Sequence, residues 1–104
     1  MIIENLEFLF LGSNSFENIK FLNKSNFISL THLSLYNNKI NDISALQYCS
    51  FPSLETLNLS FNQIKDISCL YKIKSENLTN LYLNNNRIRY IEVFQKIFPS
   101  LEIK

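Results

Sequence analysis

The 104-residue sequence contains one glycine, two prolines and no tryptophan, although a chain with many turns ordinarily uses far more glycine and proline. Another residue must therefore form the turns. Asparagine is suited to this role because it tolerates the left-handed backbone region and bonds to its own backbone, and it is abundant from Asn5 to Asn86. The excess of Asn, Lys and Ile could equally reflect an AT-rich coding sequence, so not every asparagine need have a structural role.

A strong charge and a long apolar segment are also missing. Ten basic and nine acidic residues give a net charge of +1, which argues against binding to nucleic acid or to an anionic membrane. Apolar runs such as Leu9 to Leu11 are too short to span a bilayer, and the start of the sequence lacks the features of a signal peptide. We therefore expect an intracellular protein, cytoplasmic or nuclear.

Metal-binding and redox motifs are absent as well. The two cysteines, Cys49 and Cys69, have no metal-ligand spacing with the single histidine, His32. In a chain expected to be intracellular the thiols should stay reduced and buried, so we predict no metal and no cofactor.

What the sequence does contain is one pattern repeated in four copies, with a constant period of 24. Three leucine columns open each copy, an asparagine column follows, and apolar columns spaced by three residues close it. The leucine columns are Leu6, Leu30, Leu54 and Leu78; Leu9, Leu33, Leu57 and Leu81; and Leu11, Leu35, Leu59 and Leu83. The asparagine column is Asn14, Asn38, Asn62 and Asn86, and the apolar columns begin at Phe16, Ile19 and Leu22 in the first copy.

The copy from Leu54 to Leu70 shows the pattern most clearly, as L-x-x-L-x-L-x-x-N-x-I-x-x-I-x-x-L. This pattern resembles the leucine-rich repeat. The segments that follow Asn38 and Asn62 look most like the short-repeat class, which includes the regulatory subunit of type-1 protein phosphatase and internalin-type surface proteins of bacteria. Members of that class typically have a period of about 22. The longer period here implies two extra residues on the convex side of each copy.

The repeat predicts an α/β solenoid, a horseshoe segment forming one domain over residues 1–104. Within the leucine part the apolar period is two, which predicts a strand; after the asparagine it is three, which predicts a short 3-10 turn. In the last copy Val93, Phe94, Ile97 and Phe98 have the spacing of an α-helix. Stacked copies should form a parallel sheet, which the resemblance places on the concave face. The repeats begin near Leu6, Leu30, Leu54 and Leu78; a partial fifth begins at Leu101, so the fourth is one residue short.

The asparagine column is predicted to be structural. Each of Asn14, Asn38, Asn62 and Asn86 follows a strand, where its amide can bond backbone groups of the turn and of the adjacent copy. Asp42 and Asp66 precede the helical halves of two copies, where a short carboxylate can cap exposed amides.

The candidate binding site is the outward face of the strands. Aromatic and amide side chains without charges suit protein recognition, so we expect a protein partner there and no enzymatic activity, since His32 has no carboxylate in its own or the adjacent exposed column. The expected contact residues are Phe8, Phe10, His32, Ser34, Tyr36, Thr56, Asn58, Ser60, Asn80, Tyr82 and Asn84.

Three interpretations of the function stay open at this point. The first is a scaffold or regulatory module, the second is a fragment of an internalin-like surface adhesin, and the third is a purely structural spacer or assembly unit. Neither end of the repeat array shows a polar capping copy, so we also expect self-association through the ends, or continuation of the array beyond them.

Overall fold

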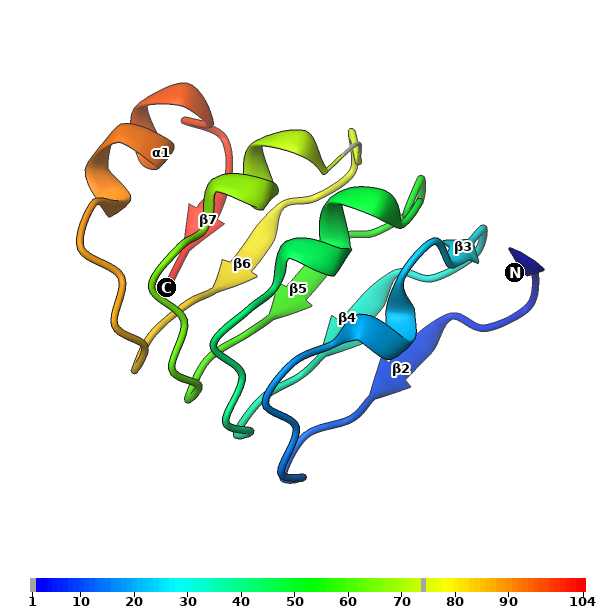
Figure 1. Cartoon of the computed structure of the whole chain (residues 1–104). Coiled ribbons are helices and arrows are strands. Elements are labelled where there is room, and N and C mark those ends of the chain that lie inside the picture. The colour runs from blue at the N-terminus through cyan, green and yellow to red at the C-terminus, as the bar shows by residue number, and fades with distance from the viewer. Residues whose placement is uncertain (1, 74) are drawn as a thin grey trace.

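The computed structural model describes residues 2–73 and 75–104, which form two layers (Figure 1). One layer is a parallel sheet; the other holds short helices and a two-stranded ribbon. The large sheet contains β2 (Phe8–Phe10), β4 (His32–Ser34), β5 (Thr56–Asn58), β6 (Asn80–Tyr82) and β7 (Glu102–Ile103). The other layer contains β1 (Ile2–Ile3), β3 (Asn26–Phe27), the 3-10 helices η1 (Lys20–Leu22), η2 (Ser44–Tyr48) and η3 (Ser68–Lys72), and the α-helix α1 (Ile91–Ile97).

The sheet order β2-β4-β5-β6-β7 follows the order of the chain, and every pairing is parallel. Phe8 pairs with His32, His32 with Thr56 and Thr56 with Asn80, so these coils keep the period found in the sequence. The chain returns through the second layer between strands (Figure 1). This arrangement confirms the predicted α/β solenoid of parallel strands and short helical turns.

The last strand pairing departs from the predicted spacing. Asn80 pairs with Glu102, whereas the sequence repeat places Ile103, one position later, opposite Asn80. In the preceding coils two consecutive amides share one carbonyl: Thr79 N–H and Asn80 N–H both donate to the Glu55 carbonyl. The Thr79 carbonyl accepts only the Glu102 N–H of the next strand. The residue that shares a carbonyl in the other coils is therefore missing before β7.

The core lies between the two layers and is built from the repeated apolar columns. Stacking buries them because one coil alone leaves its apolar edge open to water, whereas a neighbour on each side removes that edge from solvent. The buried columns include Leu30 and Leu54; Leu33, Leu57 and Leu81; Leu35, Leu59 and Leu83; Ile40 and Ile64; Ile43 and Ile67; and Leu46 and Leu70. Two stacked phenylalanines, Phe27 in β3 and Phe51 in the following coil, extend this core, with ring centroids 5.5 Å apart.

The helical turns begin where the sequence predicts caps. The Ser44 N–H donates to Asp42 Oδ1 at 2.9 Å, and the Ser68 N–H donates to Asp66 Oδ1 at 2.8 Å. These amides and the serine hydroxyls lower the pKa of both carboxyl groups. Stability from this contact is therefore present at neutral pH and is lost as the pH falls through the lowered pKa values.

The final helix differs from the predicted packing. The sequence places Val93, Phe94, Ile97 and Phe98 on one apolar edge, and α1 does form there. Phe94 is buried, but Val93 and Ile97 are 58% and 55% exposed. The Tyr71 ring of the preceding coil lies edge-on to Phe94 at 5.1 Å and also near Phe98. The C-terminal part of α1 and the residue after it therefore contact the preceding coil through Phe94 and Phe98.

Candidate partner-binding face

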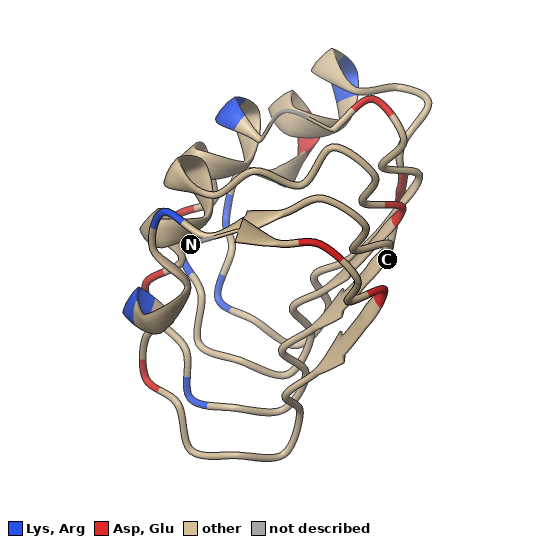
Figure 2. Cartoon of the chain, turned by 90° about the vertical axis from the view of Figure 1, so that its right-hand side faces the viewer, with Lys and Arg blue, Asp and Glu red and all other residues tan. Residues whose placement is uncertain are grey.

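The outward side chains of the strands, together with the residues just after them, form what we call the sheet face. Parallel register brings side chains from successive coils into rows across it, such as Phe8, His32, Thr56 and Asn80. Lysine, arginine and acidic residues lie mainly in the loops and helical turns (Figure 2). From β2 to β6 this face therefore offers aromatic rings, hydroxyls and amides rather than charges.

Three aromatic side chains gather at the β2 end of the sheet face. The Phe8 ring lies 6.1 Å from the Phe10 ring and 5.0 Å from the His32 ring, measured between centroids. A hydrogen bond of 2.9 Å joins His32 Nδ1 to Thr31 Oγ1 and fixes the imidazole. Phe8 and Phe10 are 52% and 68% exposed. Aromatic rings held in place yet open to solvent give a partner apolar area at little cost in side-chain entropy.

A second aromatic pair lies where β4 and β5 end. The Tyr36 ring meets the Phe61 ring edge-on at 5.5 Å, and the two side chains are 40% and 43% exposed. The sequence predicts Tyr36 on this face but not Phe61. Phe61 belongs to a row of non-glycine residues with positive φ, namely Ser13, Asn37, Phe61 and Asn85. The row is recognisable from its asparagines, but an aromatic ring is unusual in that backbone conformation.

Replacing Phe61 with asparagine is expected to stabilise the protein by about 0.5–1 kcal/mol. The φ of 58° costs an ordinary L-residue about 1–2 kcal/mol, whereas asparagine tolerates it. The ring packing against Tyr36, which asparagine cannot replace, is half exposed and contributes about 0.5 kcal/mol. Urea denaturation monitored by circular dichroism measures the change. Asn37→Phe, at φ 55°, is the reverse control and should destabilise. A fall in stability for Phe61→Asn would show that the ring packing outweighs the backbone strain.

In the middle of the face, one predicted contact residue is not available. Ser60 is only 3% exposed, so the prediction that it lies on the open surface is wrong. Its hydroxyl donates to Asn58 Oδ1 at 2.6 Å, and its backbone N–H donates to the same oxygen at 3.0 Å. The side chain of Asn58 folds back over its own strand and covers the serine. Ser34 and Thr56, in the same part of the face, are partly exposed.

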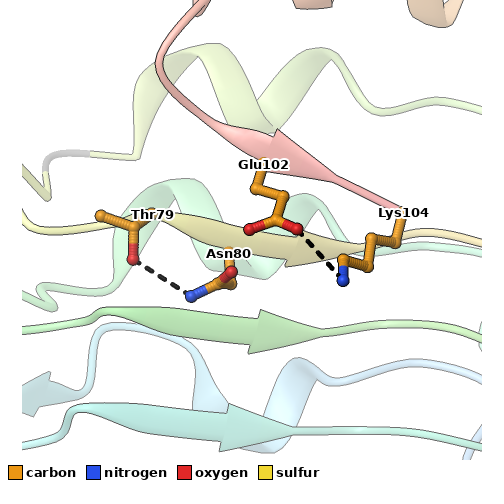
Figure 3. A network of polar contacts seen from close by, with 4 residues as sticks. All are labelled: Thr79, Asn80, Glu102 and Lys104. Atoms are coloured by element: carbon orange, nitrogen blue, oxygen red, sulfur yellow. Dashed lines mark hydrogen bonds and ion pairs between the residues drawn. The ribbon is translucent and has the colours of Figure 1, made fainter.

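The C-terminal part of the face is polar. Asn80 Nδ2 donates to Thr79 Oγ1 at 3.2 Å, and Glu102 pairs with Lys104 at 3.1 Å (Figure 3). The Lys104 ammonium also lies 5.9 Å from the centre of the Tyr82 ring. Nearby, Asn84 is exposed and donates to Asn85 Oδ1 at 3.0 Å. The face thus changes from aromatic at β2 to polar and charged at β7.

The asparagine column lies at the end of each strand and bonds backbone groups. Asn62 Nδ2 donates to the carbonyls of Leu59 and Ser60 in its own turn and of Leu35 in the preceding coil, while Asn62 Oδ1 accepts the Ile40 N–H. Asn38 and Asn86 repeat this arrangement in their coils. The side-chain Nδ2 of Asn14 donates to the carbonyls of Leu11 and Gly12 in its own turn. The amide groups of this column are therefore used in hydrogen bonds to the backbone of the fold rather than in contacts with a ligand.

Two kinds of group could give this chain reactivity, namely metal-ligating clusters and the two cysteine thiols. Over residues 2–73 and 75–104, no three histidine, cysteine or acidic residues come together in a way that could hold a metal ion. Burial raises the pKa of Cys69 to about 12 and also raises that of Cys49. Both thiols donate to backbone carbonyls, Cys49 to Leu22 and Cys69 to Ile43, so they are neutral at physiological pH. Within the same ranges, none of the helices has the length and apolar character needed to cross a membrane.

Among solved structures, one similarity is informative. The fold is similar to the crystal structure of internalin C2 from Listeria monocytogenes str. 4b F2365, with a TM-score of 0.68 and 26% sequence identity. The similarity covers 96% of this chain and 42% of the internalin C2 chain, so this chain spans less than half of that protein. No curated protein matches the sequence.

Family models match most of the sequence. A two-copy leucine-rich repeat model matches residues 4–48 and 28–72, and a single-repeat model matches residues 77–101. Repeats of this kind typically serve in binding other proteins. The repeating register of the strands, the asparagine column and these matches lead to one conclusion: the chain belongs to the leucine-rich repeat family.

Proposed function

We propose that the chain is a non-enzymatic module that binds a partner protein on its sheet face, as an intracellular scaffold or regulatory subunit. The observation that carries the proposal is the set of exposed aromatic rings on a face without charges from β2 to β6. Phe8, Phe10 and Tyr36 are 52%, 68% and 40% exposed, although apolar side chains of this size are normally buried. The module needs no metal or cofactor for this task.

The energetics of protein recognition support this face over the opposite layer. A few aromatic side chains usually dominate the binding energy, and they act best when surrounded by polar groups that exclude water on contact. The sheet face has this composition, with rings flanked by the hydroxyls of Ser34 and Thr56 and by the amide of Asn80. The rings are presented by paired strands rather than by loops, so little conformational entropy is lost on binding.

The proposal is tested by a pair of tyrosine variants. Tyr36→Ala with Tyr82→Ala removes two rings of the sheet face; Tyr48→Ala with Tyr90→Ala removes two exposed tyrosines outside it, which are 62% and 77% exposed. We expect the first variant to weaken capture of the specific partner from its native source by about tenfold or more, and the second to leave it unchanged. Quantitative mass spectrometry of the purified complexes measures both. Equal recovery of the same partners by both variants would reject the sheet face and favour a structural spacer.

A second candidate follows from the likeness to internalin C2. In that case the chain is a segment of a longer internalin-like surface protein, and the same sheet face binds its partner outside the cell. Protease treatment of intact cells separates the two candidates, because a surface protein is digested whereas an intracellular scaffold is protected.

A further inference from the structure

We propose that two copies of this chain pair through the open edge of β2, antiparallel to each other, about a two-fold axis that passes beside Leu9. The pairing joins two sheets into one. It does not depend on the partner proposed above, because the sheet face stays open when strands join edge to edge.

One edge of the large sheet is open. β2 is at the end of the strand order, with β4 on one side and, among residues 2–73 and 75–104, no strand on the other. Edge strands in natural proteins are usually protected by charged side chains, by proline or by a bulge. β2 has the sequence Phe-Leu-Phe, and no charged residue occurs between Glu7 and Glu17. Figure 2 looks toward this side of the molecule, where the strand is uncharged.

Backbone hydrogen-bonding groups of β2 point toward this open edge. The Glu7 carbonyl accepts the His32 N–H, and the Leu11 N–H donates to the Ser34 carbonyl, so these odd-numbered residues bond toward β4. Because bonding alternates along a strand, Leu9 also bonds toward β4, whereas Phe8 and Phe10 direct their N–H and carbonyl groups to the open edge. The edge therefore presents two donors and two acceptors, all from the two phenylalanines.

The open edge of β2 is complementary to the same edge of a second copy. In an antiparallel pair, a residue whose backbone groups point to the partner exchanges two hydrogen bonds with the residue directly opposite. If Phe8 lies opposite Phe10 of the second copy, the two-fold axis generates the same pair again. All four open donors and acceptors of each copy are then used, while Leu9 faces Leu9 of the second copy as a pair without hydrogen bonds. A register shifted by one residue would leave these groups unpaired.

The side chains favour the same register. Phe8 and Phe10 project from the same face, so the two-fold axis would place four phenylalanine rings side by side at the centre of the joined sheet. Directly opposite side chains have Cβ atoms about 4.5–5.5 Å apart, which is a favourable distance for aromatic pairs. On the inner side, Leu9 and Leu11 are only partly buried, unlike their counterparts Leu33 and Leu35. A second copy would cover this open end of the core.

The area that the β2 edge can bury determines the expected affinity of the dimer. A phenylalanine side chain can bury about 150–250 Å², and Phe8 and Phe10 are already partly covered, so the pair contributes well under the roughly 800 Å² per partner of a standard stable interface. We therefore expect a dimer that exchanges with monomer at concentrations on the order of 10–100 µM.

Sedimentation velocity on the full chain, from about 1 to 500 µM, tests the proposal, with Phe10→Lys as the disrupting variant. The lysine leaves the bonds to β4 in place but removes a ring and introduces a charge at two symmetric positions, so the dimer dissociation constant should rise by about 100-fold. Tyr48→Lys makes the same kind of change at a site 62% exposed on η2 and should leave dimerisation unchanged. Far-UV circular dichroism confirms that both variants are folded.

A cross-linking variant tests the register. The Cα atoms of a directly opposite pair without hydrogen bonds lie about 4.5 Å apart, within the range of a disulfide. Leu9→Cys should therefore form a covalent dimer under mild oxidation, whereas Tyr48→Cys should not. A chain that stays monomeric throughout the concentration range, or a dimer that Phe10→Lys leaves intact, would overturn the proposal. The double variant Tyr36→Ala with Tyr82→Ala leaves β2 unchanged, so it should dimerise like the original chain while losing partner capture, and the two proposals can fail separately.

Discussion

Asn62→Ala is expected to destabilise the protein by about 3–5 kcal/mol, a large part of the 5–15 kcal/mol that holds a typical domain together. The asparagine is 7% exposed, and its amide satisfies the Ile40 N–H and the carbonyls of Leu35, Leu59 and Ser60. Alanine removes all of these bonds at once. Buried backbone groups without a partner cost about 1–3 kcal/mol each, and water reaches only some of them.

Asn14→Ala is the matched control, since Asn14 occupies the same column but is exposed and its side chain bonds only within its own turn. It should cost less than about 1 kcal/mol. Urea denaturation of the original protein, Asn62→Ala and Asn14→Ala, followed by circular dichroism, measures the differences in the free energy of unfolding. Similar losses for the two variants would mean that the bonds between coils add little beyond the turn itself.

Phe51→Ala should have an effect of similar size, about 3–5 kcal/mol, for a different reason. Phe51 is 1% exposed and stacks on Phe27, with ring planes inclined by only 6°. Alanine would leave a cavity between two coils that the backbone turns on either side cannot close. The loss therefore includes both the transfer of the ring to water and the unfilled volume.

Phe21→Ala is the control for this variant, because Phe21 is 53% exposed on η1 and its ring meets only Phe16 among the aromatic contacts of the described residues. We expect it to cost about 1 kcal/mol or less. Thermal unfolding by calorimetry compares the two. If Phe51→Ala were as mild as Phe21→Ala, the coils would have to repack around the missing ring.

Column spacing in the sequence predicted much of the fold, because a constant period specifies which residues become neighbours when coils stack. His32, Thr56 and Asn80 therefore occupy adjacent strands. The spacing could not predict the step to β7, since it depends on one amide that shares a carbonyl in the earlier coils and is missing in the last. A change in backbone hydrogen bonding between two coils does not alter the spacing of apolar residues in the sequence.

Prediction of the candidate site was limited by side-chain contacts within a strand. Alternation places Ser60 in an outward column, but the Asn58 side chain, to which Ser60 is hydrogen-bonded, covers it and leaves it buried. Phe61 was missed because its column is set by positive φ rather than by alternation, and an aromatic residue gives no hint of that backbone. Tyr36 and Phe61 meet only because consecutive coils bring them together.

The asparagine column also has a direction. Asn38, Asn62 and Asn86 each reach back to the coil that precedes them in the chain, as the bonds from Asn62 to Ile40 and Leu35 show. During synthesis on the ribosome, each emerging coil thus finds the backbone groups that its asparagine requires already in place. The polar network can be completed in the order of translation, without waiting for residues still to be made.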